Sequence, residues 1–172
     1  INSGYMMIIP ASAGSAFSSS VGSTVTISNS EVTSNTSAVS SMGMVSGALY
    51  FFEAEAVTIS HTEISENTAS VSVANYPSSG AGIHSTSTEI LLLDSVTIAN
   101  NETENTSGSS TGTDAYASGL FLYEGTTYLT NSTISGNSTQ GSYVTYGAGI
   151  YLYDSTLNIS HSTITNNLAQ SS

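Results

Sequence analysis

The chain has no lysine and no arginine among its 172 residues, against 12 aspartate and glutamate residues, so its formal net charge is −12. Without cationic side chains a protein cannot neutralise phosphates, and this argues against nucleic acid as a partner. An anionic membrane surface is disfavoured for the same reason. Apolar runs such as residues 90–93 have the length of a strand, far below the roughly 20 residues of a membrane-spanning helix. These absences leave self-association and glycans as candidate partners.

Cysteine is also absent, which excludes disulfide bonds, thiolate chemistry and cysteine-based zinc sites. The polar residues are mainly serine, threonine and asparagine, which favour strands and turns over helices. Hydrophobic residues make up 38% of the chain and occur in short alternating runs, unlike the composition of a disordered acidic tail. The sequence therefore predicts a folded all-β protein.

A short motif recurs five times, in which an apolar residue is followed three positions later by an asparagine. The copies read EVTSN, EISEN, TIANN, TISGN and TITNN, and they end at Asn35, Asn67, Asn101, Asn137 and Asn167. The intervals between these asparagines are 32, 34, 36 and 30 residues. Near-constant spacing of this kind is typical of a stack of similar coils.

Further strand-like segments precede each copy of the motif. One segment lies at residues 24–28, 56–60, 90–94, 127–131 and 156–160. In four of the five units, small residues and another segment come before it, beginning at Ser46, Gly80, Ala117 and Gly147. Each unit is therefore predicted to contain three short strands, closed by the asparagine and followed by a loop rich in serine, threonine and glycine (36–46, 68–79, 102–118 and 138–146).

One such unit cannot bury its apolar side alone, whereas a stack of units can. Stacking in register predicts two interior columns, one of Val32, Ile64, Ile98, Ile134 and Ile164, the other of Ile27, Ile59, Leu93, Leu129 and Ile159. Antiparallel hairpins in a β-sandwich are the alternative, since alternating strands and turns serve that fold as well. The near-constant unit length favours a parallel β-helix of about five coils, each of roughly 30–36 residues.

The SGAL and GAGI segments and the TISGN, TITNN and EISEN closures resemble those of right-handed parallel β-helices of the pectate-lyase-like superfamily, and within it the repeats of polymorphic outer membrane proteins and autotransporter-type surface proteins. The resemblance covers about residues 20–170. It implies a right-handed solenoid over residues 24–172, with residues 1–23 as an irregular partial coil or cap. It also implies a ladder of the five closing asparagines. Asparagine tolerates the left-handed conformation that a sharp corner requires.

Enzymes with this fold cleave acidic polysaccharides, and the resemblance implies what such activity would need. The lyases use an arginine or lysine near bound calcium, and the hydrolases use a cluster of aspartates. This chain has no cationic side chain, and its only aspartates are Asp94, Asp114 and Asp154, which are not paired in sequence. We therefore predict no catalytic residue and no enzymatic activity.

Metal binding is predicted only weakly. Glu53, Glu124 and Asp154 end equivalent strands, and stacked carboxylates without cations repel one another unless a hard cation bridges them. Calcium is thus the one candidate cofactor. His61 and His161 share a turn position three units apart, and His84 lies on a different strand, so all three are predicted to be polar turn or surface residues.

Aromatic residues alternate with the inward apolar residues of the first strand in each unit and are predicted to form an outward contact surface: Tyr50, Phe52, Phe121, Tyr123, Tyr151 and Tyr153. Three uses remain open at this stage. The rings pack against another copy, stack on sugar rings, or are covered by the chain's own loops.

Several Asn-X-Ser/Thr sequons also occur, and those on the asparagine ladder are poor acceptors because their side chains are engaged. The candidate N-glycosylation sites are Asn105, Asn131 and Asn158. Together with the resemblance, they predict an extracellular or cell-surface location.

Three functions follow as hypotheses. The first is a non-enzymatic, extracellular, structural or adhesive β-helix, either a filament-forming subunit or a segment of a long cell-surface protein. Its partners are further copies, joined head to tail or laterally, or the continuation of a longer chain. The alternative is a carbohydrate-binding or carbohydrate-active β-helix. The third is an ice-binding protein, suggested by threonines flanking inward residues, although Glu63, Ala99 and Ser135 interrupt their array.

Overall fold

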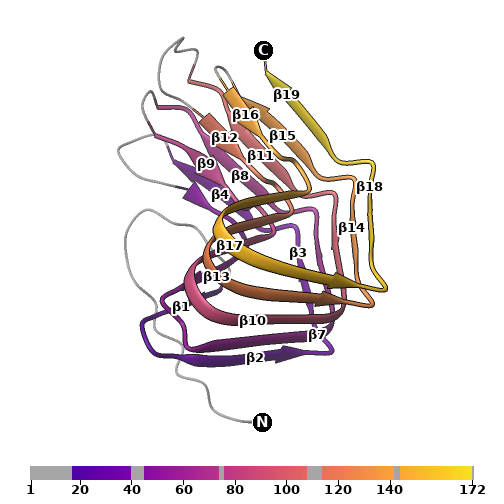
Figure 1. Ribbon diagram of the computed structural model, residues 1–172. Helices are drawn as coiled ribbons and strands as arrows, with labels where there is room; N and C mark the ends of the chain where they lie inside the picture. Colours follow the sequence, from indigo (N-terminus) through magenta and orange to yellow (C-terminus); the bar gives the residue numbers. More distant parts are fainter. Residues whose placement is uncertain (1–16, 40–44, 74–75, 108–113, 142–143, 172) are drawn as a thin grey trace.

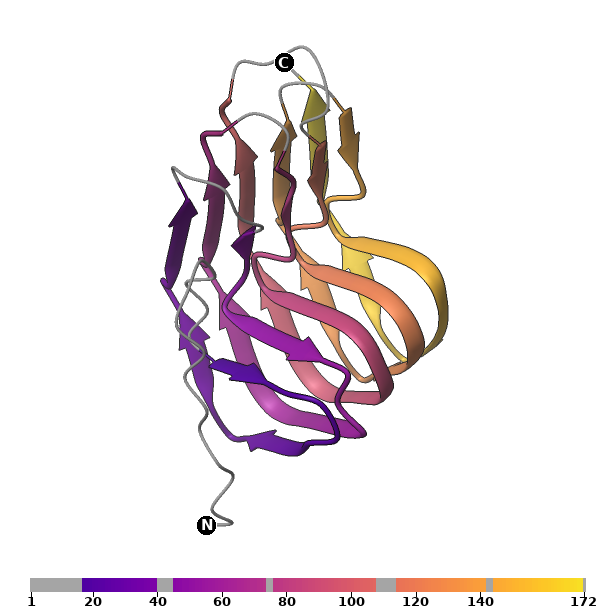
Figure 2. The same cartoon turned by 90° about the vertical axis from the view of Figure 1, so that its left-hand side faces the viewer.

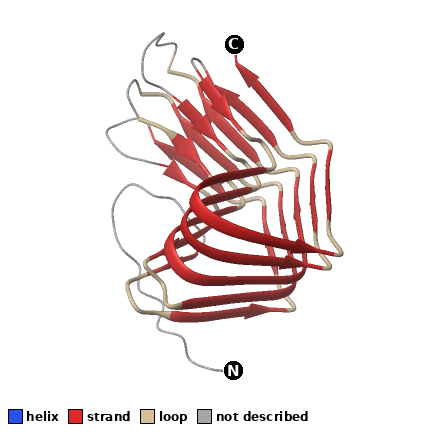
Figure 3. Ribbon diagram, viewed as in Figure 1, coloured by secondary structure: helices blue, strands red, loops and turns tan. Residues whose placement is uncertain are grey.

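The computed structural model describes residues 17–39, 45–73, 76–107, 114–141 and 144–171 (Figure 1). Every regular element in these residues is a β-strand, as Figure 3 shows by colour. All strand pairs are parallel, and the coils stack side by side along one axis (Figure 2). The predicted all-β parallel solenoid is confirmed. Among the described residues there is no helix long and apolar enough to cross a membrane.

A ten-stranded sheet wraps around the wide part of the solenoid. Its longest strands are continuous where separate short strands were predicted: in β10 all three segments of one coil merge into 17 residues. The sheet consists of β1 (Phe17–Ser19), β2 (Thr24–Ser28), β3 (Glu31–Thr33), β6 (Leu49–Phe52), β7 (Ala56–Ser65), β10 (Ile83–Ala99), β13 (Leu120–Thr130), β14 (Thr133–Ser135), β17 (Ile150–Ser160) and β18 (Thr163–Thr165).

Two smaller sheets form the narrow part of the solenoid, at the top of Figure 1. The five-stranded sheet follows the closing asparagines and contains β4 (Thr36–Val39), β8 (Thr68–Val71), β11 (Glu102–Asn105), β15 (Ser138–Gly141) and β19 (Leu168–Ser171). The four-stranded sheet contains β5 (Val45–Ser46), β9 (Ser78–Ser79), β12 (Asp114–Tyr116) and β16 (Val144–Tyr146). Apart from β19, the strands of both sheets lie in segments that were predicted to be loops, which is wrong. Their serines and threonines form strands because the coils above and below align the backbone N–H and C=O groups.

The register of the coils agrees with both predicted interior columns. Ile64 pairs with Val32 on one side and with Ile98 on the other, and Leu93 pairs with Ile59 and Leu129. The columns end at Ile164 and Ile159. The five-stranded sheet carries one strand from each of five successive coils, so four complete turns separate the first closing corner from the last.

Burial in these columns depends on the number of neighbouring coils. Ile59 and Ile64 are completely buried, whereas Ile159 and Ile164 in the last described coil are 47% and 45% exposed. The side chains are equivalent in the repeat, so the difference arises because the last described coil has a neighbour on one side only.

The corners are formed by residues with positive φ, but the ladder asparagines are not among them. The left-handed residue is the one before each ladder asparagine: Ser34, Glu66, Asn100, Gly136 and Asn166. The expectation that the ladder asparagines turn the corners themselves was therefore wrong. Their side chains must point into the solenoid to bond the next coil, while the preceding residue takes the turn.

Candidate contact surface

The predicted aromatic residues lie in two columns on the outer side of β6, β10, β13 and β17. The first column contains Tyr50, His84, Phe121 and Tyr151, in register from coil to coil. The second contains Phe52, Thr86, Tyr123 and Tyr153. The two columns alternate with inward residues, as period-two strands require.

The first column is largely covered by the protein itself. The Phe121 ring lies between His84 and Tyr151, with centroids at 4.5 Å and 5.3 Å, and the edge-on ring of Tyr116 from β12 lies 5.9 Å away. Phe121 is only 9% exposed as a result. Phe121 therefore does not belong to an exposed contact surface, and of the three predicted uses its ring shows the third, because β12, within the predicted loop 102–118, folds back over it.

His84 is completely buried in the same column, contrary to its predicted place at a turn or surface. Its Nδ1 is 2.9 Å from the Ser79 hydroxyl, and its Nε2 is 2.9 Å from the Thr86 hydroxyl. Burial lowers the pKa of His84 to about 3, and the interaction with the Ser79 backbone opposes this only in part. The imidazole is therefore neutral at ordinary pH, with both nitrogens paired.

The second column carries the aromatic ridge, which we define as the exposed Phe52 and Tyr153 together with the half-buried Tyr123. Tyr123 and Tyr153 stack almost parallel, with centroids 5.0 Å apart and an interplanar angle of 5°. Tyr153 is 53% exposed and Phe52 is 36% exposed. Each of the two stacked rings, Tyr123 and Tyr153, covers one face of the other, and the outer face of Tyr153 has no ring partner among the described residues.

Carboxylates follow the ridge at a left-handed corner. Glu53, Glu124 and Asp154 have φ values of 48°, 58° and 48°, and Ser87 occupies the same position in the coil between Glu53 and Glu124. The Ser87 hydroxyl donates to Glu124 Oε2 at 2.7 Å. The structure thus brings Glu124 and Asp154 to adjacent coils and keeps Glu53 apart. Within the described ranges there is no group of three or more histidine, aspartate or glutamate side chains placed to hold a metal.

The five closing asparagines form a continuous chain of hydrogen bonds. Each Nδ2 donates to the Oδ1 of the next asparagine, at distances of 2.9, 2.9, 3.0 and 2.8 Å from Asn35 to Asn167. The same Oδ1 also accepts the backbone N–H of the preceding ladder asparagine. From Asn67 onward, Nδ2 bonds a backbone carbonyl of the previous coil as well. Each buried amide is therefore fully paired.

The candidate glycosylation sites differ in accessibility. Asn105 is buried, its Nδ2 donates to the Tyr76 carbonyl at 3.1 Å, and its Oδ1 accepts from the Ser107 backbone at 3.2 Å. This contradicts its selection as an accessible acceptor in the folded protein. Asn131 and Asn158 are exposed, and Asn131 donates to Asp94 Oδ1 at 2.9 Å.

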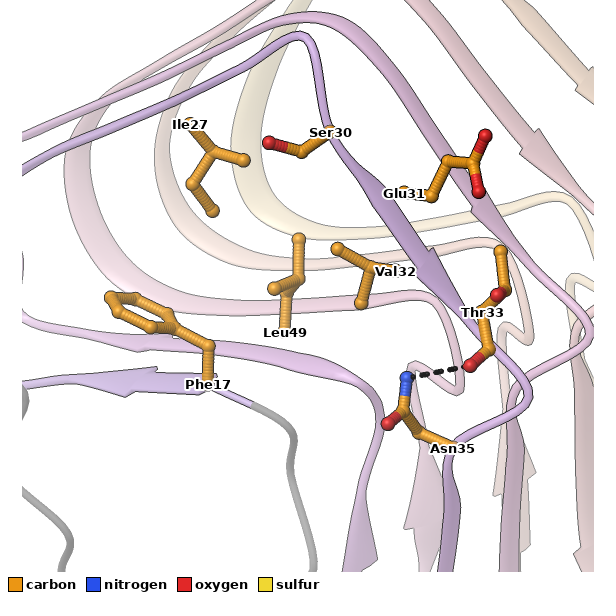
Figure 4. A pocket seen from close by; sticks show the side chains of 8 residues that line it. All are labelled: Phe17, Ile27, Ser30, Glu31, Val32, Thr33, Asn35 and Leu49. Atoms are coloured by element: carbon orange, nitrogen blue, oxygen red, sulfur yellow. Dashed lines mark hydrogen bonds between the residues drawn. The ribbon is translucent and has the colours of Figure 1, made fainter.

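A cavity opens at the first described coil (Figure 4). Phe17, Ile27 and Leu49 point into it, while Glu31 points away. Asn35 at its margin donates to the Thr33 carbonyl at 3.2 Å. The apolar part of the lining is the end of the core, and Ser30, Glu31, Thr33 and Asn35 complete it.

Comparison with protein families gives one match, to the family described as "Right handed beta helix region", over residues 7–171. The chain belongs to this right-handed β-helix family. The match supplies the handedness of the coils. Comparison with curated proteins and with solved structures gives no match.

Three side chains around the first aromatic column of this β-helix were not predicted from the sequence. Tyr116 and Tyr146 stack at 5.0 Å and flank the first aromatic column, and Ser79 bonds His84. Burial raises the pKa of Tyr116, as does its hydrogen bond to Asp114. A signal was present, because both tyrosines lie three residues before the glycine that directly precedes the curved strand, Gly119 before β13 or Gly149 before β17.

Proposed function

We propose that this β-helix is a non-enzymatic, extracellular structural or adhesive protein, acting as a filament-forming subunit or as a segment of a long cell-surface protein. The observation that carries the proposal is the asparagine ladder, which runs without a break through all five described coils. Coils joined in this way resist bending and separation, as a scaffold requires. The resemblance to autotransporter-type and polymorphic outer membrane protein repeats supports the same function.

Association with further copies is part of this proposal. Head-to-tail stacking, or continuation of the same chain, would cover Ile159 and Ile164, which are half exposed. Either arrangement extends the interior columns by one more coil and removes apolar surface from water.

Negative-stain microscopy with light scattering of purified residues 1–172 tests the proposal. We expect filaments or species of high mass that grow with protein concentration. A protein that stays monomeric, and that also fails to coat or bridge cells when displayed on a surface, would contradict both the filament and the adhesive forms.

Carbohydrate binding is the second candidate, and one observation favours it. Tyr153 has the most exposed ring of the ridge, and its outer face has no ring partner among the described residues. A pyranose ring can stack on such a face. Binding on a glycan array that is lost in Tyr153→Ser supports this function, whereas no binding and no turnover of pectin or alginate with calcium removes it.

A further inference from the structure

The second arm of each coil forms a flat outer face that was not singled out in the sequence. We define the flat face as the outward residues of strand arms 24–28, 56–60, 90–94, 126–130 and 156–160. These arms are the straight parts of β2, β7, β10, β13 and β17, which run side by side across the lower part of Figure 1. In-register parallel strands hold its side chains in regular rows.

The centre of the flat face is apolar and exposed. Ile90, Leu92 and Tyr128 are 39%, 39% and 44% exposed, whereas their inward neighbours Leu91 and Leu93 are buried. Leu92 and Tyr128 are directly paired on adjacent strands. Such a patch on a soluble protein typically marks an interaction surface.

The rim of this patch is mainly polar, and Asp94 is its one acid within the five arms. Thr58 and Thr126 flank it within the rows, and Asn158 follows Tyr128 on the next strand. An apolar centre with a polar rim is the usual anatomy of a protein interface.

The flat face is also nearly free of carboxylates. The one acid in the five arms is Asp94, at the margin, where it accepts a hydrogen bond from Asn131. Glu55 and Glu89 lie just outside the opposite margin. Two copies of a chain with a net charge of −12 and no cations repel each other, so they approach most easily through the face where few carboxylates meet.

We infer that two copies of the chain pack flat face against flat face, with Leu92 and Tyr128 at the centre. The patch lies on β10 and β13, in the middle of the five arms. A two-fold axis through the patch therefore lets the whole width of one flat face cover the flat face of the other copy. Packed sheets lie about 10 Å apart, a separation that these side chains fill. The inference rests on the proposed structural function and names the surface through which lateral association occurs.

The size of the face makes this contact weak for a single pair of molecules. Strands about 4.8 Å apart and arms of five residues at about 3.3 Å each give roughly 400 Å² per copy, near half of a standard interface. We therefore expect dimerisation with a midpoint on the order of 0.1 mM. Salt screens the carboxylates at the margin of the flat face and therefore strengthens dimerisation.

Sedimentation equilibrium of residues 1–172, between roughly 10 µM and 1 mM protein and at low and high NaCl, tests the inference. We expect a monomer–dimer equilibrium that shifts toward dimer at high salt. The double substitution Leu92→Thr with Tyr128→Thr, which copies Thr26 and Thr58 at the same position of the first two arms, should weaken dimerisation by about tenfold or more. The control Tyr153→Thr, on the aromatic ridge, should leave the dimerisation constant unchanged.

Two outcomes overturn the inference and separate it from the proposed function. If the double variant folds, as circular dichroism reports, and dimerises like the wild type, association occurs elsewhere and the structural function stands. If the wild type stays monomeric at every concentration, the flat face does not bind a second copy. If this face binds a polysaccharide instead, the result counts against both the dimer and the proposed structural function. Tyr128→Asn, which copies Asn158 of the next coil, replaces the double variant if that variant does not fold.

Discussion

At the scale of single residues, the inward polar side chains are as important to this β-helix as its apolar core. Asn67, Asn101 and Asn137 are buried with every amide atom bonded. His84 is buried with both ring nitrogens paired. Leaving one such group unpaired in the interior costs more than its hydrogen bond contributes.

Asn101→Ala should lower the free energy of unfolding by about 3 kcal/mol or more, because it removes the side-chain acceptor of the Asn67 backbone N–H and the side-chain donor to the Ile64 carbonyl and to Asn137 Oδ1. Urea denaturation followed by circular dichroism measures the effect. The exposed control Asn158→Ala should change the stability by less than about 0.5 kcal/mol. Equal effects of the two substitutions would show that the ladder does not stabilise the fold.

His84 should make the protein sensitive to acid. Its pKa in the folded state is about 3, below the usual 6.5, so the unfolded chain binds this proton more readily between these values. Stability from this group is therefore present above pH 6.5 and falls by about 1.4 kcal/mol for each pH unit down to about 3.

Thermal melts of wild type and His84→Asn between pH 7 and pH 4 measure this contribution. The variant is expected to be less stable at pH 7 and to lose less stability on acidification. His161→Asn is the matched control, because the equivalent corner of the preceding coil carries Asn131. Identical pH slopes for wild type and His84→Asn would contradict the assignment.

At the scale of elements, the register between strands depends on a few backbone positions. The β10–β13 pairing shifts between Thr88 and Ile90, opposite Gly125. Gly125 has φ of +105°, and a Cβ there would lie 1.9 Å from the Thr88 carbonyl oxygen. This bulge lets the curved strands turn from the aromatic columns to the flat face.

Gly125→Ala should therefore destabilise the protein by more than about 2 kcal/mol, because both the backbone conformation and the close carbonyl oppose a side chain. Gly22→Ala is the control for positive φ alone, since its Cβ would meet nothing within 4 Å. Its expected cost is about 1 kcal/mol. Chemical denaturation compares the two, and a smaller effect at Gly125 would show that the strands shift without cost.

At the scale of the whole molecule, charge opposes the compact state. The chain has twelve carboxylates and no lysine or arginine. Because it has no ion pairs of lysine or arginine to weaken, dissolved salt acts mainly by screening the repulsion between carboxylates. Salt should therefore stabilise this protein at neutral pH, unlike a chain rich in surface ion pairs.

The melting temperature should rise with NaCl, and millimolar calcium should add a further increase if Glu124 and Asp154 share a cation. The double variant Glu124→Gln with Asp154→Asn should lose the calcium increment and keep the NaCl effect. Glu53→Gln, whose neighbour in the column is Ser87, is the control and should keep both. An equal calcium response in the double variant would remove calcium from this corner.

The sequence by itself determined the all-β class, the coil length and the residues of both interior columns. It could do so because alternation along a strand and repetition every 30 to 36 residues are both visible in one dimension. The positions of the ladder asparagines followed from the same repeat, although their left-handed neighbours did not.

Only the tertiary structure decided which outward residues face solvent. Phe121 and Tyr153 both point outward from the first segment of their coils, yet Tyr116 lies over Phe121, which is 9% exposed, whereas Tyr153 is 53% exposed. The strands of the narrow sheets could not be predicted from the sequence either. Serine and threonine segments form these strands only because adjacent coils supply their hydrogen-bond partners. Local pattern determines which side of a strand a residue occupies, and contacts between distant segments determine whether that side is buried.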